Sequence, residues 1–123
     1  MKMRKILIID DEAPVRKLLK KLFEGNGYEV LEAANGIHGI KLFNEQNPDL
    51  IITDLIMPEK EGLETIRDLK KLNPHVPIIA ISGGGITDPK MYLDLASKFG
   101  AFRTFSKPID NEILLSTIKE ILF

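Results

Sequence analysis

Chemically active side chains directly follow or closely trail four apolar runs of this sequence. Three carboxylates, a hydroxyl and an ammonium group occupy these positions: Asp10, Asp11, Asp54, Ser82 and Lys107. If the carboxylates lie together they repel one another, and at least one of their pKa values must rise unless a cation lies between them. Mg²⁺ suits such an open oxygen site, whereas zinc is disfavoured because no histidine or cysteine is near. The pattern therefore predicts a magnesium site.

A magnesium ion, a spare carboxylate, a lysine and a hydroxyl together suit phosphoryl transfer. The carboxylate attacks phosphorus, the metal and the lysine neutralise the phosphoryl oxygens, and the hydroxyl binds one of these oxygens. Lysine fits this role because its ammonium group is a compact point charge. Each residue alone has a plainer interpretation, such as a helix cap or a turn for the aspartates.

The five side chains can act together only if the fold brings the ends of the apolar runs to one place. Short apolar runs alternate five times with stretches of helical period, which predicts an α/β domain with a parallel sheet. The expected strands are residues 5–9, 28–33, 50–53, 78–81 and 101–105. The expected helices begin at Pro14 and then cover about 36–46, 61–72, 89–99 and 111–123. The carboxyl ends of parallel strands share one edge, where ligands bind.

Helical spacing also predicts which side chains face the core. The first helix carries an apolar stripe that consists of Val15, Leu18, Leu19, Leu22 and Phe23. The apolar sides of later helices include Ile37, Phe99 and Ile113. Lysines fill the other face of the first helix and are expected to be solvated.

The composition is that of an ordinary globular protein. The 123 residues fit one domain, 1–123, with a single core. A net charge of −1 offers no electrostatic case for a nucleic-acid or membrane partner, and the absence of cysteine excludes disulfides and thiolate sites. The first apolar run is too short for a signal peptide, so a cytoplasmic protein is expected.

Four motifs, in this order, resemble the receiver domain of bacterial two-component response regulators, most simply the single-domain chemotaxis regulator. They are "LIIDDE" (7–12), "PDLIITDLIMPEKEG" (48–62), "IAISGG" (79–84) and "GAFRTFSKP" (100–108). The resemblance covers the whole chain. It implies a flavodoxin-like, doubly wound sheet of five parallel strands in the order 2-1-3-4-5.

The resemblance assigns the metal site and the acceptor. Asp54 is similar to the phosphoacceptor of the family, which also contributes to the metal site. Asp11 matches a direct Mg²⁺ ligand, Asp10 a ligand through water, and the backbone carbonyl of Ile56 the third protein ligand.

The resemblance also assigns the groups that hold the phosphoryl group. Lys107 matches the phosphate-binding lysine, Pro108 the cis-proline after it, and Ser82 the switch hydroxyl. Gly62 matches the loop that follows the acceptor, together with Met57 and Pro58.

The implied function is a signalling switch rather than an enzyme, although such a domain assists its own phosphorylation and dephosphorylation. A sensor histidine kinase, a phosphotransfer protein or a small phosphodonor supplies the phosphoryl group. The face made by the fourth helix, fifth strand and fifth helix then changes its affinity for a downstream protein, which the sequence does not name. The chain is expected to be a monomer or a phosphorylation-linked dimer, with no direct contact to nucleic acid or membrane.

Three departures from the family pattern bear on function. Thr104 stands at the position of the switch aromatic, and strand alternation points Phe105 to the opposite face. Ile56 and Gly84 offer no polar side chain where the family often tunes water attack on the phosphoryl group.

Two other functions compete with this one. Haloacid-dehalogenase-type phosphatases need a second aspartate two residues after the first, where this chain has Ile56. A phosphorylation-independent interaction module is the alternative that Thr104 keeps open for the output step.

Overall fold

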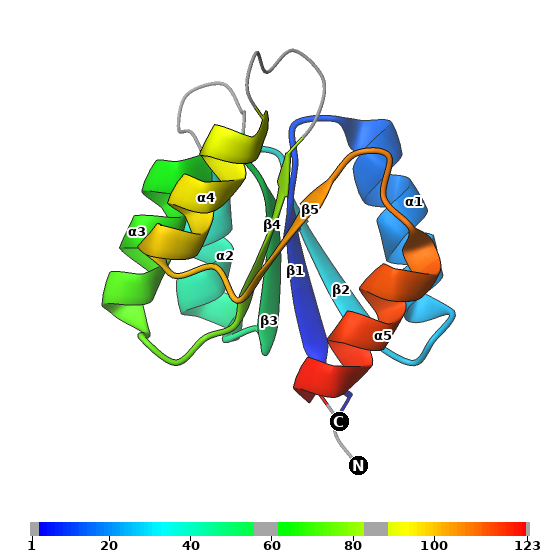
Figure 1. Ribbon diagram of the computed structural model, residues 1–123. Helices are drawn as coiled ribbons and strands as arrows, with labels where there is room; N and C mark the ends of the chain where they lie inside the picture. The colour runs from blue at the N-terminus through cyan, green and yellow to red at the C-terminus, as the bar shows by residue number, and fades with distance from the viewer. Residues whose placement is uncertain (1–2, 56–61, 83–88, 123) are drawn as a thin grey trace.

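The computed structural model describes residues 3–55, 62–82 and 89–122, and it contains the predicted five-stranded parallel sheet. The strands run in the order β2-β1-β3-β4-β5. Their bounds are β1 Lys5–Ile9, β2 Glu29–Ala33, β3 Leu50–Asp54, β4 Ile78–Ser82 and β5 Arg103–Ser106. The helices are α1 Ala13–Glu24, α2 Gly36–Gln46, α3 Gly62–Leu72, α4 Pro89–Phe99 and α5 Asn111–Leu122 (Figure 1). The predicted fold class and strand order are confirmed.

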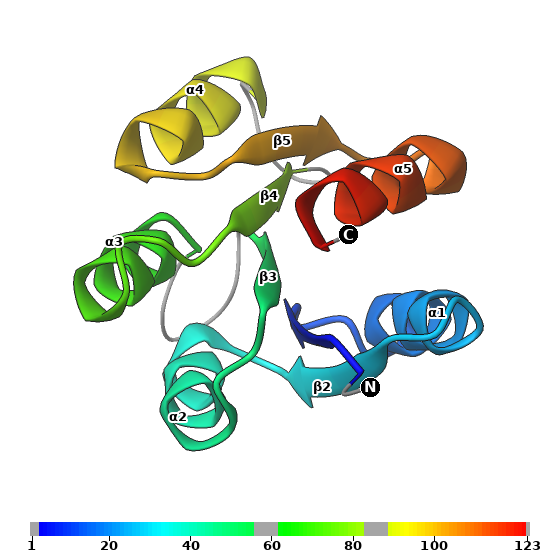
Figure 2. The same cartoon turned by 90° about the horizontal axis from the view of Figure 1, so that it is seen from below.

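Helices cover both faces of the sheet. Seen along the strands, α1 and α5 lie on one face, and α2, α3 and α4 lie on the other (Figure 2). Alternate residues of β1 therefore enter different halves of the core: Leu7 and Ile9 pack toward the three-helix face, while Ile6 and Ile8 pack toward α1 and α5. Burial on both faces explains why the central strands are continuous apolar runs rather than alternating ones.

The strand register brings the carboxyl ends of the strands to one edge. Ile9 pairs with both Ala33 and Thr53, and Ser82 at the end of β4 pairs with Ser106 at the end of β5. The residues that follow β1 and β5 thus emerge beside the last residues of β3 and β4. This edge is where the sequence predicts the chemistry.

Several boundaries differ from the predicted ones by one or two residues. β3 and β4 each extend one residue further, to Asp54 and Ser82, so these two site residues belong to the strands themselves. β5 begins at Arg103 rather than at residue 101, because the N–H of Ala101 bonds back to the carbonyl of Ala96 at the end of α4. Gly100, with φ of 117°, permits that reversal.

The predicted apolar helix faces were too wide. Leu18, Ile37, Phe99 and Ile113 are 62%, 59%, 40% and 53% exposed, although the spacing predicted them on core-facing sides. A helix lying on a sheet buries a stripe narrower than its whole apolar arc, so residues at the margin of the arc stay in solvent. Among the described residues, no helix is both long and apolar enough to span a membrane.

Candidate functional site

Two buried carboxylates mark the edge of the sheet where β1 and β3 end. Asp10 follows the last residue of β1 and is 2% exposed, and Asp54 closes β3 and is 6% exposed. Asp11 and Glu12, in the turn that leads to α1, are exposed. One oxygen from each of these four side chains lies within 4.8 Å of the others. The predicted grouping of Asp10, Asp11 and Asp54 is therefore present.

Lys107 reaches this cluster from the segment after β5. Its Nζ lies 3.5 Å from Oδ2 of Asp54, 3.5 Å from Oε1 of Glu12 and 3.7 Å from Oδ2 of Asp10. Partial burial works to lower the pKa of Lys107, but the three carboxylates outweigh it and raise this pKa above its ordinary value. The lysine is therefore fully charged at neutral pH.

The backbone on either side of Lys107 fixes where its side chain starts. Its N–H donates to the carbonyl of Ser82 at 2.7 Å, which continues the pairing of β5 with β4. The Lys107–Pro108 peptide bond is cis, as the family resemblance implies.

The environment of Asp10 disfavours the ionised form of its carboxylate. Burial is the largest cause that raises the pKa of Asp10 from 3.8 to about 6, and the charge of Asp54 raises it further. The N–H of Glu12, which donates to Oδ1 of Asp10 at 2.9 Å, lowers this pKa and so opposes the shift. Lys107 lowers the pKa of Asp10, but one ammonium group shared by three carboxylates does not restore the ordinary value. A second positive charge at this edge would relieve the repulsion.

The residues present fit a magnesium ion. In the described part of the site, the possible ligands are carboxylate oxygens of four acids. Two of these acids are buried and two are exposed, so water can also reach the site. This is the donor set that Mg²⁺ takes with several retained waters. Ile56, whose carbonyl is the expected third protein ligand, lies outside the described residues, as do Met57, Pro58 and Gly84.

The hydroxyl group of Ser82 is buried at the end of β4. Its side chain is fully buried, and its Oγ has no hydrogen-bond partner among the described residues. A buried hydroxyl without a partner is costly, so its hydrogen bond is expected to go to a bound water, ion or ligand. It lies one register position from Asp54, which pairs with the adjacent Ile81.

Gly62, which begins α3, packs directly onto the end of β3. A Cβ at this position would overlap the carbonyl oxygen of Asp54 and the Cα of Leu55. The N–H of Gly62 donates to the carbonyl of Leu55 at 2.9 Å, which closes the chain back onto the strand. A glycine here thus allows the backbone to pass close behind Asp54.

The whole chain, and not only this site, can be compared with known families. The model of the response regulator receiver domain matches residues 6–119. The chain is a member of the response regulator receiver family.

The receiver domain is similar over almost its whole length to single-domain relatives. It is 34% identical over 119 residues to the chemotaxis protein CheY of Bacillus subtilis (strain 168), with 96% of this chain and 97% of that protein covered. It is 30% identical over 118 residues to the sporulation initiation phosphotransferase F of the same organism, with 96% and 93% covered. A crystal structure of a receiver domain protein from Clostridium thermocellum aligns with a TM-score of 0.90 at 35% identity, covering 98% of this chain and 94% of that one.

Longer regulators also contain a matching segment. The transcriptional regulatory protein GlrR of Escherichia coli (strain K12) is 31% identical over 118 residues, which cover 95% of this chain but 26% of that protein. The match therefore concerns about a quarter of GlrR.

Two charged residues of this receiver domain were missed as parts of the site. Glu12 is the N-cap residue of α1 and makes no side-chain cap hydrogen bond; its carboxylate faces Lys107 instead. Arg16, in α1, donates from its Nη1 to the backbone carbonyl of Asp10 at 2.7 Å. Their positions two and six residues after Asp10 were the available signal, but which way each side chain turns depends on the assembled fold.

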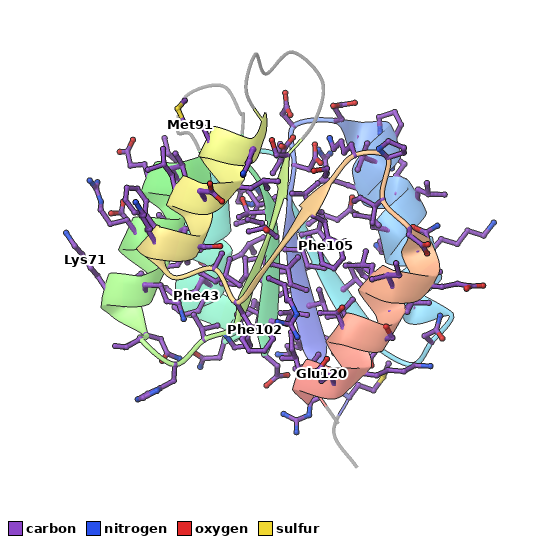
Figure 3. The ribbon with its side chains drawn as sticks, viewed as in Figure 1. Phe43, Lys71, Met91, Phe102, Phe105 and Glu120 are labelled. Atoms are coloured by element: carbon purple, nitrogen blue, oxygen red, sulfur yellow. The ribbon has the colours of Figure 1, made fainter. Side chains whose placement is uncertain are left out.

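The expectation that Phe105 points to the face opposite that of Thr104 agrees with the geometry. Phe105 packs against the half of the core under α1 and α5 (Figure 3). Thr104 pairs in register with Ala80, whose side chain belongs to the opposite half. His38 and His75 are exposed and do not join the acidic cluster.

Proposed function

We propose that this receiver domain is the phosphoacceptor switch of a two-component phosphorelay. Asp54 accepts a phosphoryl group from a histidine kinase or a phosphotransfer protein. The observation that carries the proposal is the placement of Asp54 Oδ2, at a buried strand end, 3.5 Å from the ammonium group of Lys107 and within the acidic cluster. A charged lysine beside a carboxylate is what an incoming phosphoryl group needs to approach a nucleophile of like charge.

The transfer itself is a displacement at phosphorus. A carboxylate oxygen of Asp54 forms the new bond to phosphorus while the bond from phosphorus to the donor nitrogen breaks, and its electron pair stays on that nitrogen, which takes up a proton. Lys107, which already contacts Asp54, neutralises a phosphoryl oxygen. When Mg²⁺ is bound, it supplies further neutralisation of the phosphoryl oxygens, held by Asp10, Asp11, Asp54 and the carbonyl of Ile56. This chain acts as acceptor rather than as an enzyme that turns over.

Ser82 supports a switch rather than a passive acceptor. Its buried Oγ, without a partner among the described residues, can donate to a phosphoryl oxygen on Asp54. That new bond would stabilise the phosphorylated state and thereby shift the population of the α4, β5 and α5 face.

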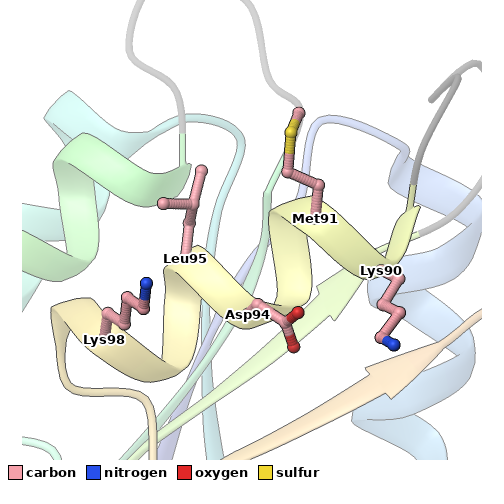
Figure 4. Close-up of a pocket in the computed structure, with 5 residues that line it drawn as sticks. All are labelled: Lys90, Met91, Asp94, Leu95 and Lys98. Atoms are coloured by element: carbon pink, nitrogen blue, oxygen red, sulfur yellow. The ribbon is translucent and has the colours of Figure 1, made fainter.

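The α4 surface offers a place for a downstream protein to sense that shift. Residues of α4 line a hollow of about 300 Å³, formed by Lys90, Met91, Asp94, Leu95 and Lys98 (Figure 4). None of the acidic site residues lines it, so a protein bound there would read the state of the site through the fold.

A protein donor has a separate surface near Lys107. The exposed Leu18 of α1 lines a hollow of about 280 Å³ to which Lys107 and Pro108 also contribute. A donor helix covering α1 would therefore lie beside the lysine without blocking the α4 hollow, because the two hollows have no described residue in common.

The test is phosphorylation by acetyl phosphate with Mg²⁺, followed by intact mass. We expect an adduct of one phosphoryl group in the unaltered protein, none without Mg²⁺, and none in Asp54→Asn. Asp94→Asn, which changes an exposed carboxylate of α4, is the matched control and should be phosphorylated normally.

Two results would contradict the proposal. An adduct that persists in Asp54→Asn would place the acceptor elsewhere. No adduct from acetyl phosphate or from a histidine kinase, in a folded protein that binds Mg²⁺, would favour the phosphorylation-independent interaction module.

A further inference from the structure

Arg16 links three parts of the fold behind the acidic edge. It lies in the second turn of α1, and its side chain is 17% exposed. Its Nη1 donates to the backbone carbonyl of Asp10 at 2.7 Å, and its Nε donates to Oε1 of Glu32, on β2, at 3.3 Å. Lys20, one helical turn further on, pairs with the other oxygen of Glu32 at 3.6 Å. The two ends of one guanidinium group thus connect β2 to the first residue after β1.

The carbonyl of Asp10 needs this partner because β1 has ended. The N–H of Asp10 still bonds to the carbonyl of Ala33, at 3.1 Å, but β2 ends at that residue. Beyond it, the turn to α1 is held by the N–H of Glu12, which donates to Oδ1 of Asp10, and by the N–H of Arg16, which donates to the carbonyl of Glu12 at 3.1 Å. The contact of Arg16 with Asp10 is shorter than any of these three bonds.

We propose that Arg16, anchored by Glu32, is a positioning residue that fixes the turn carrying Asp10 and Asp11 and so prepares their carboxylates to bind a divalent cation. The inference rests on the proposed function, since it concerns the metal site of the phosphoacceptor. Carboxylates in a turn can hold a small octahedral ion only if the backbone does not shift, because Mg²⁺ tolerates little distortion. Groups that orient metal ligands change metal affinity by about 10- to 100-fold when removed.

The geometry requires arginine rather than any cation. The planar guanidinium group presents separate N–H donors to Asp10 and to Glu32. A lysine carries a single compact ammonium group, which cannot reach both partners in the same way. We therefore expect Arg16→Lys to keep the positive charge near the cluster but to lose one of the two contacts. This separates positioning from simple neutralisation of the acids.

The experiment is a Mg²⁺ titration followed by ¹H–¹⁵N NMR, which reports binding and folding in the same spectra. We expect Arg16→Met to raise the Mg²⁺ dissociation constant about tenfold, at the low end of the range for such orienting groups. Arg16→Lys and Glu32→Gln should raise it by smaller factors. Lys20→Met, which removes the neighbouring partner of Glu32, should leave it unchanged and is the matched control.

A purely structural role gives a different result. If Arg16 only fastened α1 to β2, Arg16→Met would lower the urea midpoint while the folded protein bound Mg²⁺ as tightly as the unaltered chain, and this result would overturn the inference. An unchanged affinity in both Arg16→Lys and Glu32→Gln would overturn it as well. These two milder variants decide the matter if Arg16→Met does not fold.

Failure of the inference can be told apart from failure of the proposed function. The acetyl phosphate assay on the unaltered chain tests the phosphoacceptor role without reference to Arg16. At saturating Mg²⁺ we expect Arg16→Met to be phosphorylated within about twofold of the unaltered rate, since Asp54 and Lys107 are intact; a rate that stays low despite saturation would show that Arg16 acts on the acceptor rather than on the cation. Weakened Mg²⁺ binding in a chain that forms no adduct would leave the positioning role in place and remove the switch.

Discussion

Replacing Asp10 by asparagine should stabilise the metal-free protein at neutral pH. The pKa of Asp10 is about 6 in the folded protein and 3.8 as a reference for the unfolded chain. Each pKa unit corresponds to about 1.4 kcal/mol, so keeping this buried carboxylate ionised costs the folded state about 3 kcal/mol. Asparagine removes the charge and keeps an oxygen that can accept the N–H of Glu12. We therefore expect Asp10→Asn to raise the free energy of unfolding by about 2–3 kcal/mol at pH 7.5.

The sign of the pH dependence follows from the direction of the shift. Between pH 3.8 and about 6, the folded state holds the Asp10 proton and the unfolded state does not, so stability falls as pH rises. The contribution of Asp10 is fully present below about pH 4 and is lost once the pH exceeds the folded pKa. Asp10→Asn does not lose stability in this pH range, because it has no carboxylate to ionise. The free energies of unfolding of the two proteins should therefore agree within about 1 kcal/mol at pH 4.

The assay is urea unfolding in EDTA, followed by far-UV circular dichroism at pH 4, 5.5 and 7.5. With a urea slope of about 1–3 kcal/mol per molar, the midpoint of Asp10→Asn should lie about 1 M above that of the unaltered protein at pH 7.5. Asp94→Asn, at an exposed position, should show no such difference. Added Mg²⁺ should stabilise the unaltered protein and narrow the gap, because ligands that bind the folded state alone stabilise it.

Two results would contradict this prediction. In the first, Asp10→Asn is no more stable than the unaltered protein at pH 7.5. In the second, the difference in stability is the same at pH 4 and pH 7.5, because a gain that does not depend on protonation cannot come from the carboxylate charge. The first outcome would mean that Lys107, at 3.7 Å, already compensates the charge of Asp10 in the absence of metal.

Three further predictions concern packing around the site, and each is read by urea unfolding. Gly62→Ala should lower the free energy of unfolding by about 1–3 kcal/mol, because the added methyl group overlaps the backbone at the end of β3. Gly25→Ala, the control, should change it by less than about 1 kcal/mol. Equal effects of the two substitutions would contradict the close approach of Gly62 to β3. Ser82→Ala should leave stability unchanged or raise it by up to about 1 kcal/mol, since its buried hydroxyl has no described partner, and a loss above 1 kcal/mol would reveal one. Leu19→Ala should cost about 2–5 kcal/mol and Leu18→Ala less than about 0.5, and similar costs would show that the exposed leucine is packed.

The fold could be predicted from local patterns because its strands are buried on both faces. A strand such as β1 must then be a continuous apolar run, and helices between such runs force parallel pairing, so the carboxyl ends meet. The grouping of Asp10, Asp54, Ser82 and Lys107 followed from this rule, with each residue at or just beyond the end of a run. The cis bond before Pro108 came from the family resemblance, since spacing carries no signal for it.

Which helix residues are buried was predicted less well, for a physical reason. Periodicity identifies an apolar arc but not the line along which a helix touches the sheet, and that line depends on its neighbours. Leu19 and Phe23 are in the core, while Leu18, at the margin of the same arc, stays in solvent beside the hollow that Lys107 lines.

The residue types and their spacing were enough to predict the chemistry at the edge of the sheet: oxygen ligands, one lysine, one hydroxyl and no thiol. How the charged groups pair with one another depends on the folded arrangement. It turned Glu12 toward Lys107, placed Arg16 on the carbonyl of Asp10, and raised the pKa of Asp10 to about 6. Residue types and spacing are local properties of the chain, whereas burial and electrostatic repulsion depend on groups that folding brings together from distant positions.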